Sequence, residues 1–511
     1  MAEHYVEKSP ADFFYENRAI AGFDNPVRAA YSAIRELVEN ALDACEENGI
    51  LPDIEVTVER GESGGEWIIK VKDNGSGIPA EVIPECFGKV LFSSKYGNVQ
   101  RRGRFGMGGT MAVLYGQITT NKPVHVRSSV GDGFEAEMDI KIDIQRNMPI
   151  AIPPPEKAMK KSDKPWHGTE VTLYIEAEYP KARQKVYEYL KHTAVVAPYM
   201  NLRFKDPYQE LIFTRKTEKL PAKPKEVRYH PEGVDLETLR RMIANSKART
   251  ITGFLTSSFQ RLGPQTAKKI VEKARLENKN PRRLSDKELL KLYKAMKNTN
   301  YQAPDPSCLS PLGVELLKAG VIKEFNPEFA EAVQRPPRAY QGHPFIVELA
   351  IAYGGGVPAT PDFLLFRFAN KIPLLYDEYS DVSSRVIRQI NWSRYGIKPD
   401  MPIAIFVHVV STKIPFKTLG KEYIAYIPEI AREIEIGLRE LARKLSLYLS
   451  KKKAAMLAER REKTLLKYAK WSSALISEVL LVEEEEVYNL YVRLVRSKTG
   501  GVKIGGEDTD S

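Results

Sequence analysis

Apolar residues recur at helical spacing in the segment 29–45, where Ile34, Leu37, Val38 and Leu42 fall on one side of a helix. That spacing predicts a long amphipathic helix. Alternating apolar and polar residues after it are typical of strands, and a turn-rich stretch of Asp, Asn and Gly follows. The first 220 residues therefore predict a mixed layer of helices and sheet, with strands at 54–58, 67–71, 125–128, 134–144 and 170–175 and a second helix through 111–115.

The middle of the chain, 235–297, has a helical pattern throughout and follows a Pro-rich linker at 221–233. Breaks at 262–265 and 278–283 divide this segment, which predicts a small helical bundle.

The last third carries three predicted strands and then a long helix, starting near Pro428 and running through Lys470. Apolar and charged residues interleave along that helix, so we expect it to face solvent or a partner. The acidic run 483–486 and the C-terminal end predict a mobile tail. The predicted strands lie at 345–353, 364–368 and 403–410.

The length of 511 residues exceeds what one core supports and predicts about three domains. With 43% hydrophobic residues, the chain is not disordered as a whole. Its three Cys and seven His have no paired spacing, which excludes a disulfide framework and a structural zinc site. No run approaches the roughly 20 apolar residues of a membrane span, and no signal pattern opens the chain. We therefore expect a cytoplasmic protein without a membrane partner.

The positive charge is concentrated in the predicted bundle. The chain carries a net charge of +11, and the segment 240–297 alone holds 16 basic and 4 acidic residues. The remaining chain is close to neutral, at −1. A solvated helical face is the ordinary explanation of a charge run, but a run that holds the whole surplus of the chain favours a polyanionic partner such as DNA.

Glu36 and Asn40 lie one helical turn apart, so both side chains project from the same face of the first helix. An amide oxygen is a suitable ligand for Mg²⁺, and a neighbouring carboxylate can deprotonate water. The pair therefore suits hydrolysis of Mg²⁺–nucleotide, with Glu36 as catalytic base and Asn40 as metal ligand. Asp43, three residues later, can support them. Alone, such a pair is also common on exposed helix faces.

Two Gly-rich loops strengthen this interpretation. Asp73 follows a strand, and Gly75 and Gly77 let the backbone approach a planar ligand, so that the carboxylate can accept the amine of adenine. A second loop runs into a helix N-terminus, where phosphates bind well. A hydroxyl near the base is expected from Thr169. The predicted phosphate-binding set comprises Ser94, Lys95, Gly103, Arg104, Phe105, Gly106, Met107, Gly108, Gly109 and Thr110.

The ordered motifs ELVENALDA, DNGSGI, GRFGMGG and HGT resemble those of the GHKL (Bergerat) ATPases, and no Walker-type P-loop accompanies them. This resemblance implies an ATP pocket with Mg²⁺ under a mobile lid at 94–110. Some GHKL proteins have a Val-Lys pair where this chain has Gly109 and Thr110, so a phosphate-contacting lysine in that loop is not carried over.

The later motifs SFQRLGPQTAKKI, AYQGHPFIVELAIAYGG, RFANKIPLLYD and STKIPFKTLGKE resemble the ATPase subunits of type IIB topoisomerases, the topoisomerase VI family, over almost the whole chain. The resemblance implies an α+β multidomain chain. Residues 1–226 are expected to form a GHKL ATPase α/β sandwich with an N-terminal strap, and residues 227–304 an inserted helix-two-turn-helix domain. Residues 305–470 are expected to form a transducer domain of ribosomal small-subunit protein-like α/β fold that ends in a long helix. Residues 471–511 are expected to form a partner-facing segment with a mobile tail.

In that family a transducer lysine senses the γ-phosphate. The matching residue here is Lys421, with Lys413 as second choice. The segment Trp392, Ser393, Arg394 and Tyr395 matches a W-K-x-Y DNA-contact motif except at Ser393. In the basic bundle, Lys279, Arg282 and Arg283 are the expected DNA contacts.

The resemblance implies an ATP-operated gate on double-stranded DNA. Two copies dimerise through their N-terminal segments around 1–16 when ATP binds, and a DNA-cleaving topoisomerase VI A subunit cuts the DNA, giving an A2B2 heterotetramer that relaxes or decatenates DNA. No Tyr beside an acidic D-x-D strand motif indicates a cleavage site in this chain. The alternatives are a GHKL ATPase of the mismatch-repair or chaperone type, and a DNA-binding scaffold without activity, against which the intact Glu36, Asn40 and Asp73 argue.

Overall fold

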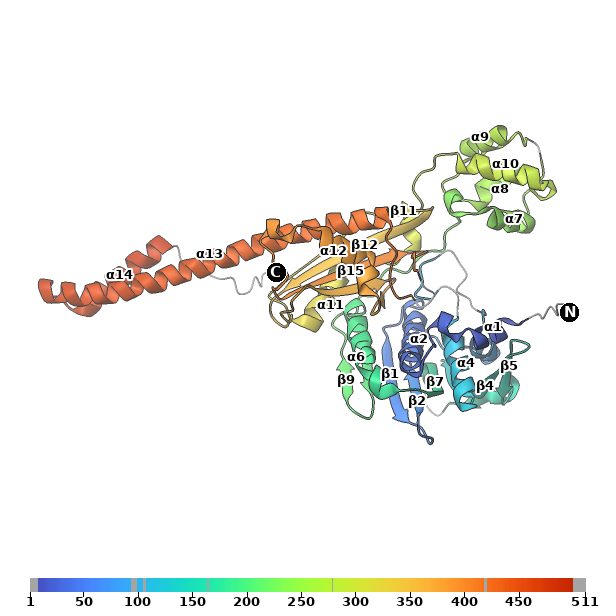
Figure 1. The fold of residues 1–511 in the computed structure, drawn as a ribbon, viewed down its shortest axis with the longest axis horizontal. Coiled ribbons are helices and arrows are strands. Elements are labelled where there is room, and N and C mark those ends of the chain that lie inside the picture. Colours follow the sequence, from blue (N-terminus) through green and yellow to red (C-terminus); the bar gives the residue numbers. More distant parts are fainter. Residues whose placement is uncertain are drawn as a thin grey trace, which may run out of the picture. The chain divides into compact units, whose positions relative to one another are not determined.

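The computed structural model describes residues 8–92, 99–103, 107–162, 165–277, 279–417 and 421–499. Contacts divide the chain into two compact units (Figure 1). The first comprises Met1–Ile390 with Pro399–Leu438, and the second comprises Asn391–Lys398 with Arg439–Ser511. Each unit is described by itself below.

The first sheet of the larger unit has nine strands in the order β5-β4-β3-β7-β2-β1-β8-β9, with β6 paired to β4. All the pairs are antiparallel except β1 with β8, which is parallel. The strands predicted for this region are all present. The bounds are β1 Asp53–Arg60, β2 Glu66–Lys72, β3 Val124–Val130, β4 Phe134–Asp143, β5 Met148–Ile152, β6 Met159–Lys161, β7 His167–Glu176, β8 Asn201–Lys205 and β9 Glu210–Phe213.

Helix α2 (Pro26–Glu46) is the predicted amphipathic helix, and it packs between α4 (Gly108–Thr120) and α6 (Tyr179–Val196) against this sheet. The side chain of Asn25 caps its first turn by accepting a hydrogen bond from the backbone N–H of Arg28, and Pro26 fits the first helical position. Shorter helices complete the layer: α1 Pro10–Glu16, α3 Ile83–Gly88 and α5 Pro155–Ala158.

The basic segment forms the predicted helical bundle, with a hydrophobic core cluster of its own. The predicted breaks separate α8 from α9 and α9 from α10. A capping box of Ser285 and Glu288 starts the last helix. The helices are α7 Leu236–Asn245, α8 Ile251–Ser258, α9 Pro264–Ala274 and α10 Asp286–Lys297, with a short 3₁₀ turn η3 at Pro281–Arg283.

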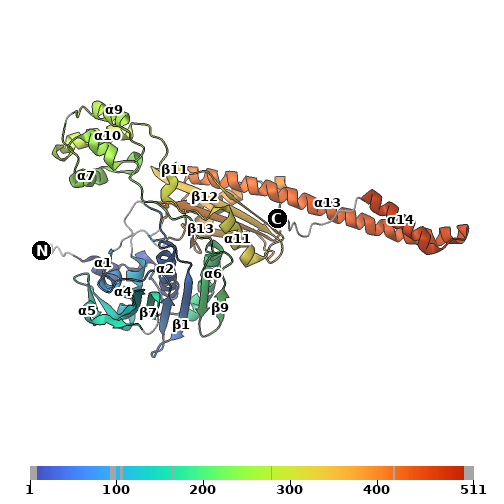
Figure 2. The same cartoon turned by 180° about the vertical axis from the view of Figure 1, so that it is seen from behind.

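A second sheet of six strands follows, in the order β10-β12-β15-β13-β14 with β11 paired to β12 (Figure 2). Its central strands β12 and β15 are buried along almost their whole length, as strands covered on both faces are. The elements are α11 Gly313–Phe325, β10 Phe329–Gln334, β11 Arg338–Tyr340, β12 His343–Tyr353, β13 Leu364–Ala369, β14 Ile372–Pro373, α12 Val382–Gln389 and β15 Ile403–Ser411.

One continuous hydrophobic core joins the two sheets of this unit. Helix α11 lies on the second sheet and also packs against α6 of the first layer. Phe325, Phe366 and Phe406 of the second sheet region belong to the same buried cluster as Leu42 and Leu190 of the first.

The C-terminal helix is longer than predicted. Helix α13 spans Pro428–Leu480 rather than ending at Lys470, and α14 spans Glu484–Thr499. The acidic run 483–486, expected in a mobile tail, leads into α14 in this structure, where acidic side chains in the first turn stabilise the helix N-terminus. The end of the chain from residue 500 lies outside the described residues. Within the parts of 8–499 that are described, no helix is long and apolar enough to cross a membrane.

Gly320 marks the closest approach between α11 and α6. A Cβ atom at this position would lie 1.8 Å from the carbonyl oxygen of Val195. We predict that Gly320→Ala lowers the free energy of unfolding by about 1–3 kcal/mol or more, because the backbones must move apart. Thermal or denaturant melting measures the loss.

Gly253→Ala in α8 is the matched control. Its Cβ meets only the Thr250 hydroxyl, at 3.0 Å, and alanine favours the helix by up to about 1 kcal/mol. Equal melting of wild type and Gly320→Ala would contradict the close contact.

Candidate functional site

Helix α2 presents the predicted catalytic pair. The Glu36 carboxylate is buried, whereas Asn40, one turn later, is exposed. Arg35 Nη2 lies 2.6 Å from Glu36 Oε1. Lys421 Nζ lies 3.8 Å from the same oxygen and 3.3 Å from Glu39 Oε2. The base is therefore held between two cations.

Of the two candidate lysines, Lys421 is the one whose ammonium group reaches α2. Although burial by itself lowers its pKa, Glu36 and Glu39 raise the pKa of the Lys421 ammonium above its ordinary value. Lys413 lies elsewhere, in the electrostatic surroundings of Asp235 at the start of the helical bundle. The geometry favours Lys421 as the lysine that belongs to this site.

The N-terminus of α4 approaches this pair closely. A Cβ atom at Gly108 would lie 1.7 Å from Glu36 Oε2, and one at Gly109 would lie 3.1 Å from Asn40 Nδ2. A side chain at position 108 would therefore displace the Glu36 carboxylate. Helix α4 starts without a side-chain cap, and the Thr110 hydroxyl turns back to the carbonyl of Met107. The start of this helix suits phosphate groups that lie beside Glu36 and Asn40.

Asp73 lies at the end of β2 as predicted. Its Oδ1 atom accepts hydrogen bonds from the backbone N–H groups of Gly75 (2.8 Å) and Thr169 (3.2 Å). Burial raises the pKa of this carboxyl to about 6. Gly77, at φ +70°, leaves no room for a side chain, because its Cβ would lie 2.0 Å from the carbonyl oxygen of Ser129.

Thr169 contacts Asp73 through its backbone N–H, and its hydroxyl lies 3.1 Å from the hydroxyl of Ser128. Gly103 lies in open space. The other predicted phosphate-binding residues, Ser94, Lys95, Arg104, Phe105 and Gly106, lie outside the described residues.

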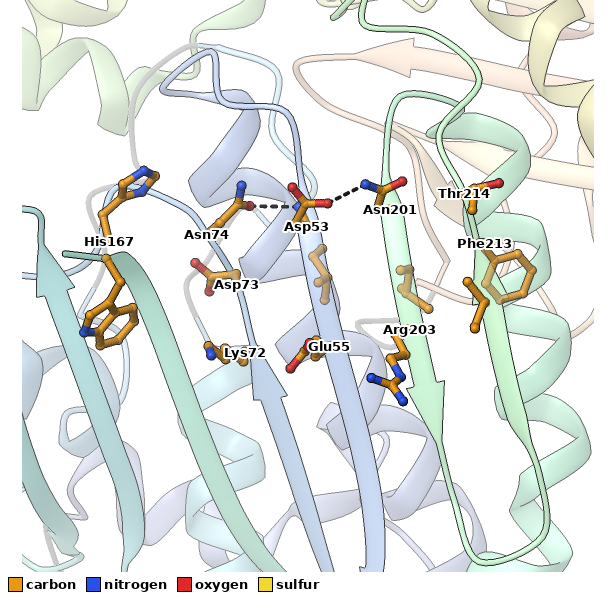
Figure 3. A pocket seen from close by; sticks show the side chains of 14 residues that line it. Asp53, Glu55, Lys72, Asp73, Asn74, His167, Asn201, Arg203, Phe213 and Thr214 are labelled. Atoms are coloured by element: carbon orange, nitrogen blue, oxygen red, sulfur yellow. Dashed lines mark hydrogen bonds between the residues drawn. The ribbon is translucent and has the colours of Figure 1, made fainter. Parts of the chain in front are cut away.

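A cavity of about 450 Å³ opens at the ends of β1, β2, β8 and β9 and includes Asp73 in its lining (Figure 3). Glu36 and Asn40 do not line it. Its polar groups tie the strand ends together: the Asn201 amide donates to Asp53, and the Asp53 backbone N–H donates to the side chain of Asn74 (Figure 3). The His167 ring lies 2.7 Å from the carbonyl oxygen of Gly75. These contacts hold the loop that carries Asp73.

Sequence reasoning missed the charged residues Arg35 and Glu39 of α2 itself, and Arg102, which pairs with the predicted Asp43. Arg35 and Glu39 are part of the site, and Asp43 pairs with Arg102 at 2.8 Å. Among the described residues, no group of three or more His, Cys, Asp or Glu side chains is placed to hold a metal ion. A magnesium ion at Asn40 would have water and nucleotide oxygens available as its further ligands.

The predicted DNA contacts occupy both units. In the first, Arg282 and Arg283 are exposed on η3, and the exposed Lys279 forms an ion pair with Glu288. In the second, Arg394 is exposed and Tyr395 is half-buried, but Trp392 is 7% exposed. The Trp392 ring is therefore not available at the surface in this structure.

Two family models match the chain. Residues 25–146 match the histidine kinase-, DNA gyrase B- and HSP90-like ATPase family, and residues 304–461 match the topoisomerase VI B subunit transducer family. The first match covers α2, the Asp73 loop and α4, and the second covers the segment with Lys421. The transducer match favours a topoisomerase over the mismatch-repair and chaperone alternatives.

Curated relatives agree with both matches. The B subunit of type 2 DNA topoisomerase 6 from Sulfurisphaera tokodaii is 44% identical over 475 residues, covering 91% of this chain and 89% of the relative. The protein of the same name from Metallosphaera sedula is 42% identical over 511 residues, covering 97% and 96%. This chain therefore belongs to the topoisomerase VI B-subunit family, the ATPase subunits of type II DNA topoisomerases.

Proposed function

We propose that the chain uses ATP binding and hydrolysis to close and reopen a clamp on double-stranded DNA, while a DNA-cleaving A subunit makes the breaks through which a second duplex passes. Two copies would dimerise through their N-terminal segments in an A2B2 assembly. The observation that carries the proposal is the position of Lys421. Its ammonium group extends from the transducer to Glu36 and Glu39 of helix α2. Such a lysine can report the state of the nucleotide to the rest of the molecule.

Glu36 is the proposed catalytic base, and Asn40 together with the phosphates would hold Mg²⁺, which would neutralise phosphate charge. Asp73 accepts the adenine amine, and the start of α4 receives the phosphates. In this structure Arg35 and Lys421 neutralise Glu36. A γ-phosphate competes with Glu36 and Glu39 for Lys421, which frees the Glu36 carboxylate to take a proton from water.

ATP hydrolysis is coupled to movement of the transducer because Lys421 binds ATP and ADP differently. A lysine that contacts ATP but not ADP favours one transducer position before hydrolysis and another after it. The free energy available to open and close the clamp is therefore limited by the difference between the binding free energies of Lys421 for ATP and for ADP.

For the DNA-cleaving partner, the end of α13 offers an apolar surface. Leu475, Val479, Leu480 and Leu481 are between 63% and 93% exposed. Exposed apolar clusters of this kind are uncommon on the surfaces of monomeric soluble proteins and are typical of protein–protein interfaces. We assign this surface to the A subunit. The basic bundle, with Arg282 and Arg283, is the proposed DNA surface inside the clamp, and Arg394 and Tyr395 are a second one.

We predict that Glu36→Gln loses ATP turnover by about 10²–10⁴-fold while it still binds ATP, because the amide cannot accept the proton of water. With the A subunit added, wild type relaxes supercoiled DNA through many ATP-driven cycles, and the variant should stop after one. Steady-state ATP hydrolysis and supercoil relaxation measure both effects. Glu81→Gln, at an exposed position, is the control. Wild-type turnover in Glu36→Gln would overturn the assignment of the base.

We predict opposite effects of Asp73→Asn on stability and on nucleotide affinity. Both backbone donors reach Oδ1, so Asn keeps both hydrogen bonds without a buried charge. Because the folded-state pKa of Asp73 is raised to about 6, its contribution to stability is present below about pH 4 and lost as the pH rises through 6. The variant should therefore gain up to about 3 kcal/mol over wild type between pH 4 and pH 7, measured by denaturant unfolding.

The same variant should bind ATP at least about tenfold more weakly at pH 7, since an amide N–H₂ would face the adenine amine. Titration calorimetry of ATP binding measures this effect. Asp132→Asn, at an exposed turn, should change neither property. Unchanged affinity in Asp73→Asn would exclude Asp73 from adenine recognition.

We predict that replacing Arg282 and Arg283 by Gln weakens duplex binding and lowers the slope of log K against log salt by about 2, since about 0.9 counterions are released per phosphate contact. Replacing Lys181 and Lys185 by Gln removes the same charge from α6 and should leave the slope unchanged. Binding titrations over a range of salt concentrations distinguish the two. Equal slopes in both double variants would mean that the bundle does not touch DNA phosphates.

A further inference from the structure

A short part of the predicted lid, residues 99–103 (the lid strip), is held by hydrogen bonds between helix α2 and the transducer. Gln100 and Arg102 are both 5% exposed. The backbone N–H of Gln100 donates to the carbonyl of Cys308, and its side-chain oxygen accepts from the backbone N–H of Ser310. The strip is therefore attached to the start of the transducer region rather than lying free over the pocket.

Arg102 attaches the same strip to α2. Its guanidinium donates to Asp43 Oδ1 at 2.8 Å and to Glu46 Oε1 at 2.5 Å. Tyr199 adds its hydroxyl to Glu46 Oε1 at 2.6 Å. Asp43 and Glu46 follow Glu36 and Asn40 along one face of α2, so the helix that carries the proposed hydrolytic residues also holds the lid strip.

The transducer reaches this point through the tight turn between β13 and β14. Lys371 Nζ lies 2.6 Å from Glu46 Oε2. The Asn370 amide donates to the carbonyl oxygens of Arg101 and Ser411, at 3.1 and 2.9 Å. One turn of the transducer therefore contacts both the lid strip and α2.

The conformation of this turn indicates that the Lys371 side chain matters. Asn370 and Lys371 have φ values of 48° and 66°, the left-handed pair of a two-residue hairpin in which Asn-Gly is favoured. A lysine at the second position carries a conformational cost of about 1–2 kcal/mol that glycine would avoid. Its ammonium group is instead placed on Glu46.

The turn is braced from behind by the second sheet. The backbone N–H of Lys371 donates to His408 Nε2 at 2.9 Å, and His408 Nδ1 lies 2.8 Å from Glu348. Glu348 accepts from the backbone N–H groups of Leu312 and Gly313 at the start of α11. The turn is thereby connected to β15, β12 and the start of α11.

The charges at this point depend on one another. Burial alone would raise the pKa of Glu46, but Arg102 and Lys371 hold it at about 2. Burial lowers the pKa of Lys371, and Glu46 opposes that effect. Removing either cation leaves a buried carboxylate with incomplete compensation.

We propose that Lys371 and Asn370 form a second coupling point between nucleotide and transducer, separate from Lys421, at which movement of the lid strip is transmitted to the second sheet. This inference rests on the proposed function, because the lid strip leads through Gly103 toward Met107 and Gly108 beside Glu36. Lys371 is a positioning residue: it acts through Glu46 and Arg102 and does not touch the reacting atoms.

The test compares Lys371→Met, Lys371→Arg and the control Lys318→Met. Lys318 pairs with Glu331 within the transducer at 2.9 Å and contributes no contact to the lid strip. In the chain alone, hydrogen exchange is measured with and without the ATP analogue AMP-PNP. In wild type and Lys318→Met we expect the analogue to slow exchange in both 99–103 and 364–374 by about threefold or more. In Lys371→Met only the lid strip should respond, and Lys371→Arg should recover the response.

A second readout uses the complex with the A subunit. Lys371→Met should consume about fivefold more ATP for each supercoil removed, whereas a loss of folded protein would lower both activities together. Glu46→Gln should raise the ATP consumed for each supercoil removed in the same way. This variant replaces Lys371→Met in the experiment if Lys371→Met does not fold. A normal AMP-PNP response of 364–374 in folded Lys371→Met, or unchanged ATP consumption for each supercoil removed by that folded variant, would overturn the inference. If the wild-type pair fails to relax DNA, the proposed function fails, while the exchange measurement on the chain alone still decides this inference.

Discussion

The rest of this structure depends on the buried carboxylates of one helix. Helix α2 carries four of them on neighbouring turns, and each is paired with a largely buried cation. Buried charges are tolerated only when they are compensated, and loss of one partner costs about 3–5 kcal/mol. Arg35 and Arg102 come from the ATPase layer, but Lys371 and Lys421 come from the transducer, so the helix is neutralised only when both parts are assembled. The carboxylates are those of Glu36, Glu39, Asp43 and Glu46.

This constraint connects packing with chemistry. The contact of α11 with α6 and the shared hydrophobic core bring the second sheet close enough for its lysines to reach α2. The core is non-directional and fixes proximity, whereas the ion pairs fix which residues meet. A nucleotide at the proposed site beside Glu36 and Asn40 would add negative charge to the same helix face. It would therefore act on the contacts that hold the ATPase layer to the transducer.

Local patterns in the sequence predicted α2, the bundle, five of the nine strands of the first sheet and three of the six strands of the second, because each of these has a clear period or turn signal. Helices α6, α11 and α14 were not predicted and α13 was predicted too short, since tertiary packing and, for α14, a favourable acidic first turn decided them. Glu36, Asn40 and Asp73 could be found from spacing, and Lys421 from a resemblance. The pair of Lys371 with Glu46 joins residues 325 positions apart in the chain, and no local pattern indicates such a pair.

The chain carries two kinds of electrostatic contact that respond differently to the solution around it. The cations of the bundle, Arg282 and Arg283 among them, are exposed, so dissolved ions screen them within a Debye length of about 10 Å at 0.1 M salt. The pairs around α2 are shielded from those ions by the protein. Ionic strength therefore acts on the outer surface of the molecule and leaves its internal charge balance nearly unchanged. Salt would weaken the proposed binding of a polyanion to the bundle without weakening the link between the two sheets.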